Sequence, residues 1–254
     1  KVIKPLLEYG ANVACTNKKK QTPLHLAAFK GNFDTIAYLC SDRVGADVWA
    51  EDENGRTPLH CVLYCSPGAR GFSLESTLVI SIAKLLAEHV GLRRRSSYYN
   101  KPDKEGMTPF LLSCSTFGTA TMNYFLKLPF INVDAVSRNG DTALHIAMHS
   151  QHHADVLHKL EILLPYISCI HRCNKNGETP MTIAKDRMEL EDNEDFEQDV
   201  RLMEDTEARM EESSLAFAMG LHPRIGKESS MYGLDVEMAH MVKDALRNYI
   251  KSRN

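Results

Sequence analysis

The segment Gln21-Thr-Pro-Leu-His25 decides the fold, because closely similar segments recur along the chain. The further copies are Arg56-Thr-Pro-Leu-His60, Met107-Thr-Pro-Phe-Leu111, Asp141-Thr-Ala-Leu-His145 and Glu178-Thr-Pro-Met-Thr182. Successive threonines of this motif are 35, 51, 34 and 37 residues apart. Self-similarity at such a spacing is typical of a repeat array, in which each unit buries its apolar face against its neighbours.

A tight turn is expected before each threonine. Four of these turns end in glycine, namely Asp52-Glu-Asn-Gly55, Asp103-Lys-Glu-Gly106, Ser137-Arg-Asn-Gly140 and Asn174-Lys-Asn-Gly177. An Asx or Ser side chain can bond the backbone two residues on, and glycine adopts a positive φ without a Cβ clash. In the first copy Lys20 stands in place of this glycine. That turn therefore either has another shape or tolerates strain of about 1–2 kcal/mol.

Each turn is predicted to lead into two helices. Threonine suits the N-cap, and proline suits the first helical position, where its missing N–H costs nothing. In the unit that starts at Thr22, the small residues Ala27 and Ala28 allow a second helix to approach closely after a turn at Gly31. The longer third unit has two extra stretches, at 66–73 and at 92–100. Insertions in repeat arrays map to loops and often carry the specific part of the function.

The run Thr-Pro-Leu-His-x-Ala-Ala at 22–28, together with Leu-Leu-x-x-Gly-Ala at 6–11, resembles the ankyrin-repeat family. The resemblance covers about residues 1–185. It implies an all-α dominated repeat solenoid, with helix pairs joined by β-hairpin turns, and partners held by the hairpin tips and short inner helices. It implies no catalytic activity. In the fourth unit Phe110 and Leu111 replace the Leu-His pair, so the hydrogen bond that the family's histidine makes is expected to be lost there.

The predicted organisation has three parts. The repeat array occupies 1–185, with a truncated first repeat and further repeats near 16–50, 51–100, 101–135, 136–172 and 173–185 onward. Because residues 2–11 read as the second half of an earlier unit, the native chain is expected to continue upstream of Lys1. Residues 186–212 are expected to form an acidic capping helix with Phe196, Val200 and Met203 on one face. Residues 213–254 are expected to form a C-terminal helical extension that packs on the acidic helix or enters a groove on another subunit.

The composition is that of an ordinary globular protein, with 43% hydrophobic and 25% charged residues. It excludes a collagen-like or wholly disordered chain. The net charge of −3 conceals an acidic segment, 189–212, with 12 Asp or Glu and 2 Arg, against 28 Lys or Arg and 21 Asp or Glu elsewhere. No apolar run approaches the roughly 18–20 residues that a membrane helix needs, so no membrane span is predicted.

The cysteines indicate the compartment rather than a disulfide framework. Their number, 7, is odd, and their surroundings are apolar, so we expect reduced, buried thiols and a reducing compartment such as the cytoplasm. The cysteines lie at positions 15, 40, 61, 65, 114, 169 and 173.

Several constellations suggest chemistry without completing a site. His145 and His149 have the i, i+4 spacing of zinc enzymes, and His152, His153 and His158 lie nearby, but an intervening glutamate and a firm third ligand are missing. The cysteine pairs 61/65 and 169/173 are not CxxC knuckles. No nucleophile elbow and no phosphate-binding glycine loop occurs in the sequence. We therefore predict no metal, no cofactor and no enzymatic activity.

Two basic triplets invite a nucleic-acid interpretation. They are Lys18–Lys20 and Arg93–Arg95, and Tyr98 and Tyr99 offer aromatic rings near the second. Two triplets in a chain with a pI near 6.4 do not make an extended positive face, which disfavours nucleic acid. Solvated surface, contact with an acidic protein and contact with a scaffolding RNA remain open for each triplet.

The sequence therefore predicts a non-catalytic scaffold that binds an acidic partner protein, with a structural subunit of a larger complex as one variant of this prediction. The alternative is a regulatory or adaptor arm of a longer enzyme or channel. The candidate contact residues are exposed positions on the tips, inner helices and basic triplets. They are Lys18, Lys19, Lys20, Gln21, Phe29, Lys30, Glu53, Asn54, Arg56, Tyr64, Arg93, Arg94, Arg95, Lys104, Glu105, Met107, Arg138, Asn139, Asp141 and His149.

Overall fold

The computed structural model describes residues 3–64, 75–116, 119–149, 153–167, 170–191, 200–206 and 208–209. The chain divides into two compact units, Lys1–Val200 and Arg201–Asn254. The first unit contains the repeats. Of the second unit, residues 201–206 are helical, and Met203 is buried within the chain. The predicted extension 213–254 lies outside the described residues, as does the predicted insertion 66–73.

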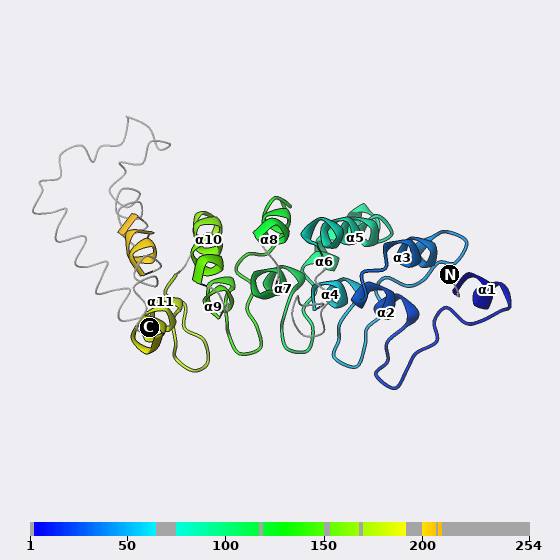
Figure 1. The fold of residues 1–254 in the computed structure, drawn as a ribbon, viewed down its shortest axis with the longest axis horizontal. Helices are drawn as coiled ribbons and strands as arrows, with labels where there is room; N and C mark the ends of the chain where they lie inside the picture. Colours follow the sequence, from blue (N-terminus) through cyan, green and yellow to red (C-terminus); the bar gives the residue numbers. More distant parts are fainter. Residues whose placement is uncertain are drawn as a thin grey trace, which may run out of the picture. The chain divides into compact units, whose positions relative to one another are not determined.

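Helix pairs in two rows build the first unit (Figure 1). The inner row contains α2 (Pro23–Phe29), α4 (Pro58–Leu63), α7 (Pro109–Thr116), α9 (Ala143–Met148) and α11 (Pro180–Glu191). The outer row contains α3 (Phe33–Cys40), α5 (Ser76–Glu88), α8 (Thr119–Leu126) and α10 (His153–Leu163), and α1 (Ile3–Glu8) precedes them. Neighbouring helices of each row contact one another, from α2 to α11 and from α3 to α10. The all-α repeat solenoid predicted from the sequence is confirmed.

The residues that recur in each repeat explain where the inner helices begin. Thr22, Thr57 and Thr142 have extended backbones (φ −81 to −83°) and stand as N-caps, with proline following at two of them. The N-cap side chain satisfies amides that the first turn leaves without a partner. At the start of the first outer helix, Asn32 Oδ1 accepts from Thr35 N at 3.3 Å. The predicted helix starts are therefore confirmed at these positions.

The loops between repeats are turns and not strands. Each is closed by two backbone hydrogen bonds, as from Asp52 N to Arg56 O (3.0 Å) and from Gly55 N to Asp52 O (3.0 Å). Both bonds lie within one five-residue turn and do not build a ladder, and no β-strand occurs anywhere in the part of the chain that the structure describes. The β-hairpin turns implied by the resemblance are thus present as tight tips alone.

Apolar side chains between the two rows form the core. Leu24, Ile36, Leu59 and Leu86 are at most 1% exposed. Burying a side chain of this size contributes about 1.5–3 kcal/mol. Because each core residue contacts its own and the neighbouring repeat, stability is shared along the array.

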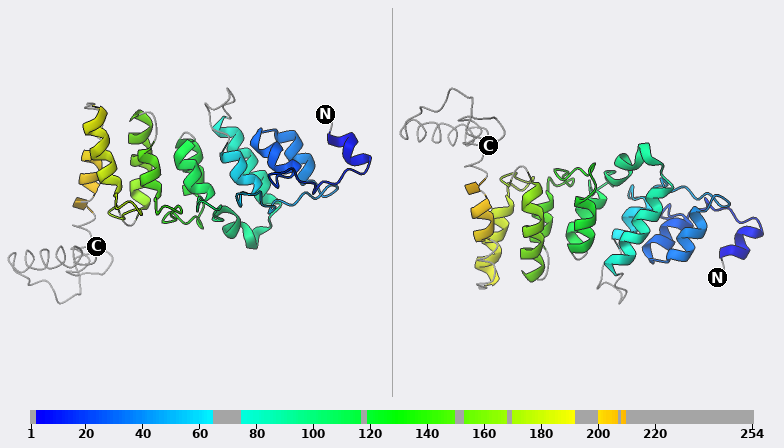
Figure 2. Two further views of the ribbon diagram at one scale, coloured as in Figure 1. Left: turned by 90° about the horizontal axis from the view of Figure 1, so that it is seen from below. Right: turned by 90° about the horizontal axis from the view of Figure 1, so that it is seen from above.

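The insertion after α5 is an ordered part of the fold. It forms η1 (Leu92–Arg94) and α6 (Arg95–Tyr99), which project from the edge of the array (Figure 2). Tyr98 and Tyr99 are fully buried, and Tyr99 packs edge-on against Phe125 with ring centroids 5.8 Å apart. The two rings noted near the arginine triplet are therefore not free for base stacking. Burying two large aromatic rings in the core is more favourable than leaving them exposed to solvent in a polar loop.

The thiols divide into two classes. Cys40, Cys61 and Cys114 are buried, and burial raises their pKa to about 11, 12 and 12. Cys15 and Cys173 are exposed, which corrects the expectation that the thiols are uniformly buried. Both exposed cysteines lie in connecting segments between helices, where no core forms around them.

None of the helices among the described residues combines the length and apolar character needed to cross a bilayer.

Candidate functional site

Five tips form the candidate interaction site. They are residues 17–21, 52–56, 103–107, 137–141 and 174–178, and together we call them the tip row. In each tip the side chain of the first residue accepts hydrogen bonds from the backbone N–H groups of the third and fifth residues. At Asp52, for example, Oδ1 accepts from Asn54 N (2.8 Å) and Arg56 N (3.0 Å). The corresponding acceptors are Asn17, Asp103, Ser137 and Asn174. The predicted Asx and Ser turns are confirmed.

A chain of backbone hydrogen bonds joins each tip to the next. The N–H of the second tip residue donates to the carbonyl of the third residue in the preceding tip. Four such bonds connect the five tips, with N···O distances between 2.6 and 2.9 Å. They run from Glu53 to Lys19, Lys104 to Asn54, Arg138 to Glu105 and Lys175 to Asn139. The tips thus form a continuous hydrogen-bonded row, from which second- and third-residue side chains extend into solvent.

The fourth residue of each tip has a positive φ. It is glycine at 55, 106, 140 and 177, with φ of 73–85°. In the first tip it is Lys20, with φ of 57°, the only described residue other than glycine with a positive φ. Of the two alternatives drawn from the sequence, the structure shows the strained one. The first tip keeps the common shape and accepts the cost of a left-handed lysine.

Histidines at the start of three inner helices hydrogen-bond to the N-cap of their own helix and to the backbone of the next repeat. His25 Nδ1 accepts from Thr22 N (3.1 Å), so its other nitrogen carries the proton, and Nε2 donates to Arg56 O of the next tip (2.9 Å). His145 repeats the arrangement with Glu178 O of the next tip, and His60 Nδ1 likewise accepts from Thr57 N while its Nε2 donates to Lys101 O, two residues before the next tip. Burial lowers the pKa of all three, that of His60 to about 4. These histidines are therefore neutral and structural.

The fourth repeat lacks this hydrogen bond from a histidine to the next repeat, as predicted. Leu111 occupies the histidine position and is fully buried. Thr108 Oγ1 accepts from the Leu111 backbone N–H at 3.2 Å, so the helix remains capped. Apolar packing replaces a hydrogen bond between the fourth and fifth repeats.

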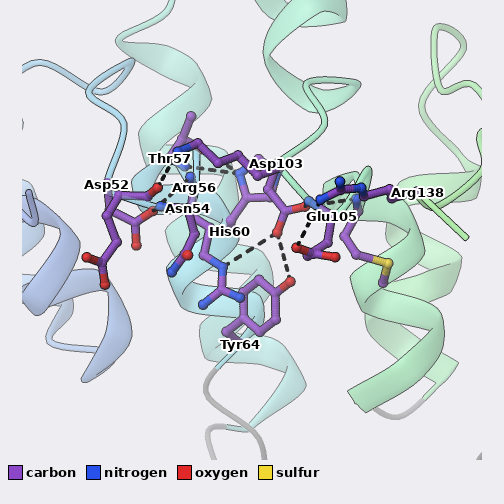
Figure 3. Close-up of polar contacts among 12 residues, drawn as sticks. Asp52, Asn54, Arg56, Thr57, His60, Tyr64, Asp103, Glu105 and Arg138 are labelled. Atoms are coloured by element: carbon purple, nitrogen blue, oxygen red, sulfur yellow. Dashed lines mark hydrogen bonds and ion pairs between the residues drawn. The ribbon is translucent and has the colours of Figure 1, made fainter. Parts of the chain in front are cut away.

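Asp103 connects two repeats at the centre of the tip row (Figure 3). Its side chain is fully buried, and Oδ1 caps its own tip, while Oδ2 accepts from the Tyr64 hydroxyl (2.8 Å) and lies 3.5 Å from Arg56 Nε. The Arg56 guanidinium also lies over the Tyr64 ring, 3.7 Å from its centroid. Burial raises the pKa of Tyr64, so its hydroxyl keeps the proton that it donates. Arg56 and Tyr64 therefore already hold the array together.

The predicted contact residues differ in exposure. Most of those on the tips and inner helices are exposed, as are two of the three arginines in the insertion. The exposed group is Lys18, Lys19, Lys20, Phe29, Lys30, Glu53, Asn54, Arg93, Arg94, Lys104, Glu105, Arg138, Asn139 and His149. The partly buried group is Gln21, Arg56, Tyr64, Arg95, Met107 and Asp141. The predicted tip residues lie together in the tip row. Arg93, Arg94 and Arg95 lie away from it, on η1 and α6.

Sequence reasoning missed two members of the site. Lys175 is exposed at the second position of the last tip and shares the same hydrogen bond to the preceding tip. The turn Asn174-Lys-Asn-Gly177 already contained this signal. Asp103 was recognised as a turn residue but not as the acceptor for Arg56 and Tyr64, because its partners lie about 40 residues away.

No group of three or more His, Cys, Asp or Glu side chains that could hold a metal ion occurs among the residues that the structure describes. His145 is bonded within its repeat, and His149 is exposed. Cys65, Cys169 and His152 lie outside the described residues, and so does the side chain of His153.

Comparison with known proteins shows similarity in sequence to ankyrin-repeat proteins. A family model described as "Ankyrin repeats (3 copies)" matches residues 1–70. Human NF-kappa-B inhibitor zeta is 26% identical over 208 residues, which cover 73% of this chain and 28% of that protein. Human Rabankyrin-5 is 29% identical over 164 residues, covering 65% of this chain and 12% of that protein. Mouse ankyrin repeat and IBR domain-containing protein 1 is 33% identical over 103 residues, covering 39% and 9%. The chain thus spans under a third of the length of each of these relatives.

Proposed function

We propose, from the premise that this chain belongs to the ankyrin-repeat family, that it is a non-catalytic scaffold whose tip row binds an acidic segment of a partner protein. Ankyrin repeats are protein-interaction modules, so a protein partner follows from the family. The acidic character of the partner and the use of the tips are our inference. The observation that supports both most strongly is the hydrogen-bonded tip row, whose fixed backbone carries exposed charged side chains.

Among the exposed charged residues of the tip row, six are basic and two, Glu53 and Glu105, are acidic. Arg138 Nη1 lies 4.0 Å from Glu105 Oε1. The first tip presents Lys18, Lys19 and Lys20, all exposed. The second position is also basic in three later tips, at Lys104, Arg138 and Lys175, with Glu53 as the exception. Complementary charge contributes to partner choice and to the rate of association more than to affinity. A partner with clustered Asp and Glu therefore fits this surface.

The spacing of the tips suits an extended segment. Neighbouring helices pack about 8–10 Å apart, and the tips that lead into them recur at a similar interval. An extended chain advances about 3.3 Å per residue, so acidic residues three apart would meet successive tips. The backbone row requires no rearrangement to present its side chains, which reduces the entropy cost of binding.

One relative supports the regulatory alternative. The name of NF-kappa-B inhibitor zeta says that it inhibits NF-kappa-B, and its likeness covers most of this chain. Under this alternative the repeats are the regulatory or adaptor arm of a longer enzyme or channel, and an NF-kappa-B subunit is the first defined partner to test. The prediction that the chain is a subunit of a larger complex rests in part on residues 213–254, which lie outside the described residues.

Binding of a labelled synthetic peptide with glutamate at every third position tests the proposal. Reversal of two charges in Lys18→Glu/Lys19→Glu should raise the peptide Kd by about tenfold, equivalent to about 1.4 kcal/mol. The matched control, Arg43→Glu/Lys127→Glu, makes the same charge change at exposed residues outside the tips and should leave the Kd nearly unchanged.

Equal weakening by both variants would show that only net charge matters and would contradict a tip site. A duplex DNA probe that binds more tightly than the peptide would favour nucleic acid instead.

A further inference from the structure

The basic insertion contains two serines that sequence alone cannot distinguish. Arg93, Arg94 and Arg95 are followed directly by Ser96 and Ser97. Arginines two and three residues before a serine are the charge pattern that protein kinases with acidic substrate grooves select. Both serines satisfy this pattern, and both are exposed on α6.

We propose that Ser96, and not Ser97, is a phosphorylation site for an arginine-directed protein kinase. In the reaction Ser96 Oγ bonds to the γ-phosphorus of ATP, and the bond from that phosphorus to the β,γ-bridging oxygen breaks. ADP leaves, and the hydroxyl proton passes to the kinase's carboxylate base. The site does not depend on the proposed function of the tip row.

The distribution of buried side chains in the insertion selects Ser96. A kinase takes its substrate as an extended chain, so the segment around the acceptor must leave its helical conformation. In η1 no residue is buried, and in α6 the buried residues are Tyr98 and Tyr99. Unwinding from Leu92 through Ser97 therefore withdraws no buried side chain from the core. Segments with few buried contacts open at low free-energy cost.

The residue after each acceptor decides between them. For Ser97 this is Tyr98, which is fully buried and packs against Trp49 with ring centroids 5.1 Å apart. A kinase that took Ser97 as its acceptor would have to extend Tyr98 as well, and this would draw the ring from the core. For Ser96 the following residue is Ser97, which is exposed.

Asn100 fixes the far end of the unwinding segment. Its Nδ2 donates to Ser96 O (2.9 Å) and to Phe130 O (2.7 Å), and its Oδ1 accepts from Asn132 N (2.8 Å). Freeing Ser96 breaks the first of these bonds and the bond from Asn100 N to Ser96 O, while the bonds to the next repeat remain. The hinge therefore lies between Ser97 and the anchored tyrosines.

A second basic triplet shows that the sequence pattern is insufficient. Lys19 and Lys20 stand three and two residues before Thr22. Thr22 is 9% exposed, and its hydroxyl lies 2.8 Å from the His25 ring nitrogen within the helix cap. Opening this site would unwind the start of α2, so Thr22 should remain unmodified.

Phosphorylation would change the charge of this edge. A phosphoserine carries about −1.5 to −2 charges at pH 7. Beside three arginines this removes most of the local positive charge and offers Arg93 and Arg94 a charge-assisted hydrogen-bond acceptor.

The test incubates the intact chain with ATP and the catalytic subunit of cAMP-dependent protein kinase as the probe enzyme, followed by site mapping by mass spectrometry. We expect phosphate on Ser96, its loss in Ser96→Ala, and an unchanged rate in Ser97→Ala. Arg93→Ala/Arg94→Ala should slow the reaction by about tenfold or more, since it removes both exposed recognition charges.

A synthetic peptide of residues 89–102 is the matched control, because it has the same sequence without the fold. Both serines should be phosphorylated in the peptide, and only Ser96 in the intact chain. Phosphate on Ser97 of the intact chain at a comparable rate would overturn the proposal. Modification of the peptide with none on the intact chain would overturn it as well.

Discussion

Lys20 adopts a backbone conformation that glycine supplies in every later tip. Its φ of 57° places an L side chain where Cβ meets the following carbonyl. The lysine nevertheless keeps the shape of the tip, because Asn17 Oδ1 still bonds the Lys19 and Gln21 amides. Side-chain capping thus compensates for strain at one residue, and it leaves an exposed charge at the proposed binding surface.

Replacing Lys20 with glycine should stabilise the protein. Relief of left-handed strain, less the extra entropy of glycine in the unfolded chain, predicts a gain of about 0.5–1 kcal/mol in the free energy of unfolding. Urea unfolding at fixed salt measures it. Lys20→Ala is the control, since it removes the charge but keeps the strain. A gain in both variants would point to repulsion among the lysines instead.

The buried histidines make stability depend on pH. His60 has a pKa of about 4 when folded and 6.5 when unfolded, so protons bind first to the unfolded chain. Its contribution is present above pH 6.5 and is lost as the pH falls toward 4, in total on the order of 3 kcal/mol. His60→Leu, which copies Leu111, should flatten the slope of unfolding free energy between pH 6.5 and 5. An unchanged slope would exclude His60 as its source.

Individual residues were predictable where the reason is local. Threonine caps, Asx turns and positive φ depend on neighbours within five positions, and these predictions were correct. The burial of Tyr98 and Tyr99 was not predicted, because it depends on Trp49 and Phe125, which are distant in sequence. The bonds of Asp103 to Arg56 and Tyr64 escaped prediction for the same reason.

At the scale of elements, the tips are packed against one another and not merely aligned. A Cβ on Gly106 would lie 2.5 Å from Arg138 N, the amide that donates to Glu105 O. A Cβ on Gly177, at the last tip, meets nothing within 4 Å. Two glycines with nearly the same φ therefore differ in what their neighbours permit.

Alanine at these two positions separates backbone strain from tip contact. Gly177→Ala should cost about 1–2 kcal/mol, because it introduces only left-handed strain. Gly106→Ala should cost more than that, because its Cβ also displaces the next tip and weakens a backbone hydrogen bond. Thermal or urea unfolding of the two variants gives the comparison. Equal losses would mean that the tips move apart freely.

Element boundaries were predictable to the extent that caps mark them. The inner helices begin at the residue after the predicted threonine, at Pro23, Pro58 and Ala143. The structure of the insertion at 92–100 was not predictable, since its helix follows from two tyrosines anchored in the core and from Asn100 bridging to Phe130. Such anchors leave no periodic signal in the sequence.

For the first unit as a whole, the repeat period predicted both the fold and the row of tips. The backbone hydrogen bonds between consecutive tips were not predicted, and they join the separate turns into one surface. Basic side chains gather on this surface, while the acid-rich segment 189–212 overlaps the end of α11 and lies largely beyond it. The charge pattern noted in the sequence thus supports an acidic partner at the tips.

Footprinting of lysines tests this central claim most directly. The intact chain is acetylated with and without a saturating peptide bearing glutamate at every third position, and the rate at each lysine is measured by mass spectrometry. The account predicts slower acetylation at Lys18, Lys19 and Lys175, with Lys84 on α5 and Lys127 directly after α8 unchanged. Equal protection of all these lysines, or protection confined to the outer helices, would contradict binding at the tip row.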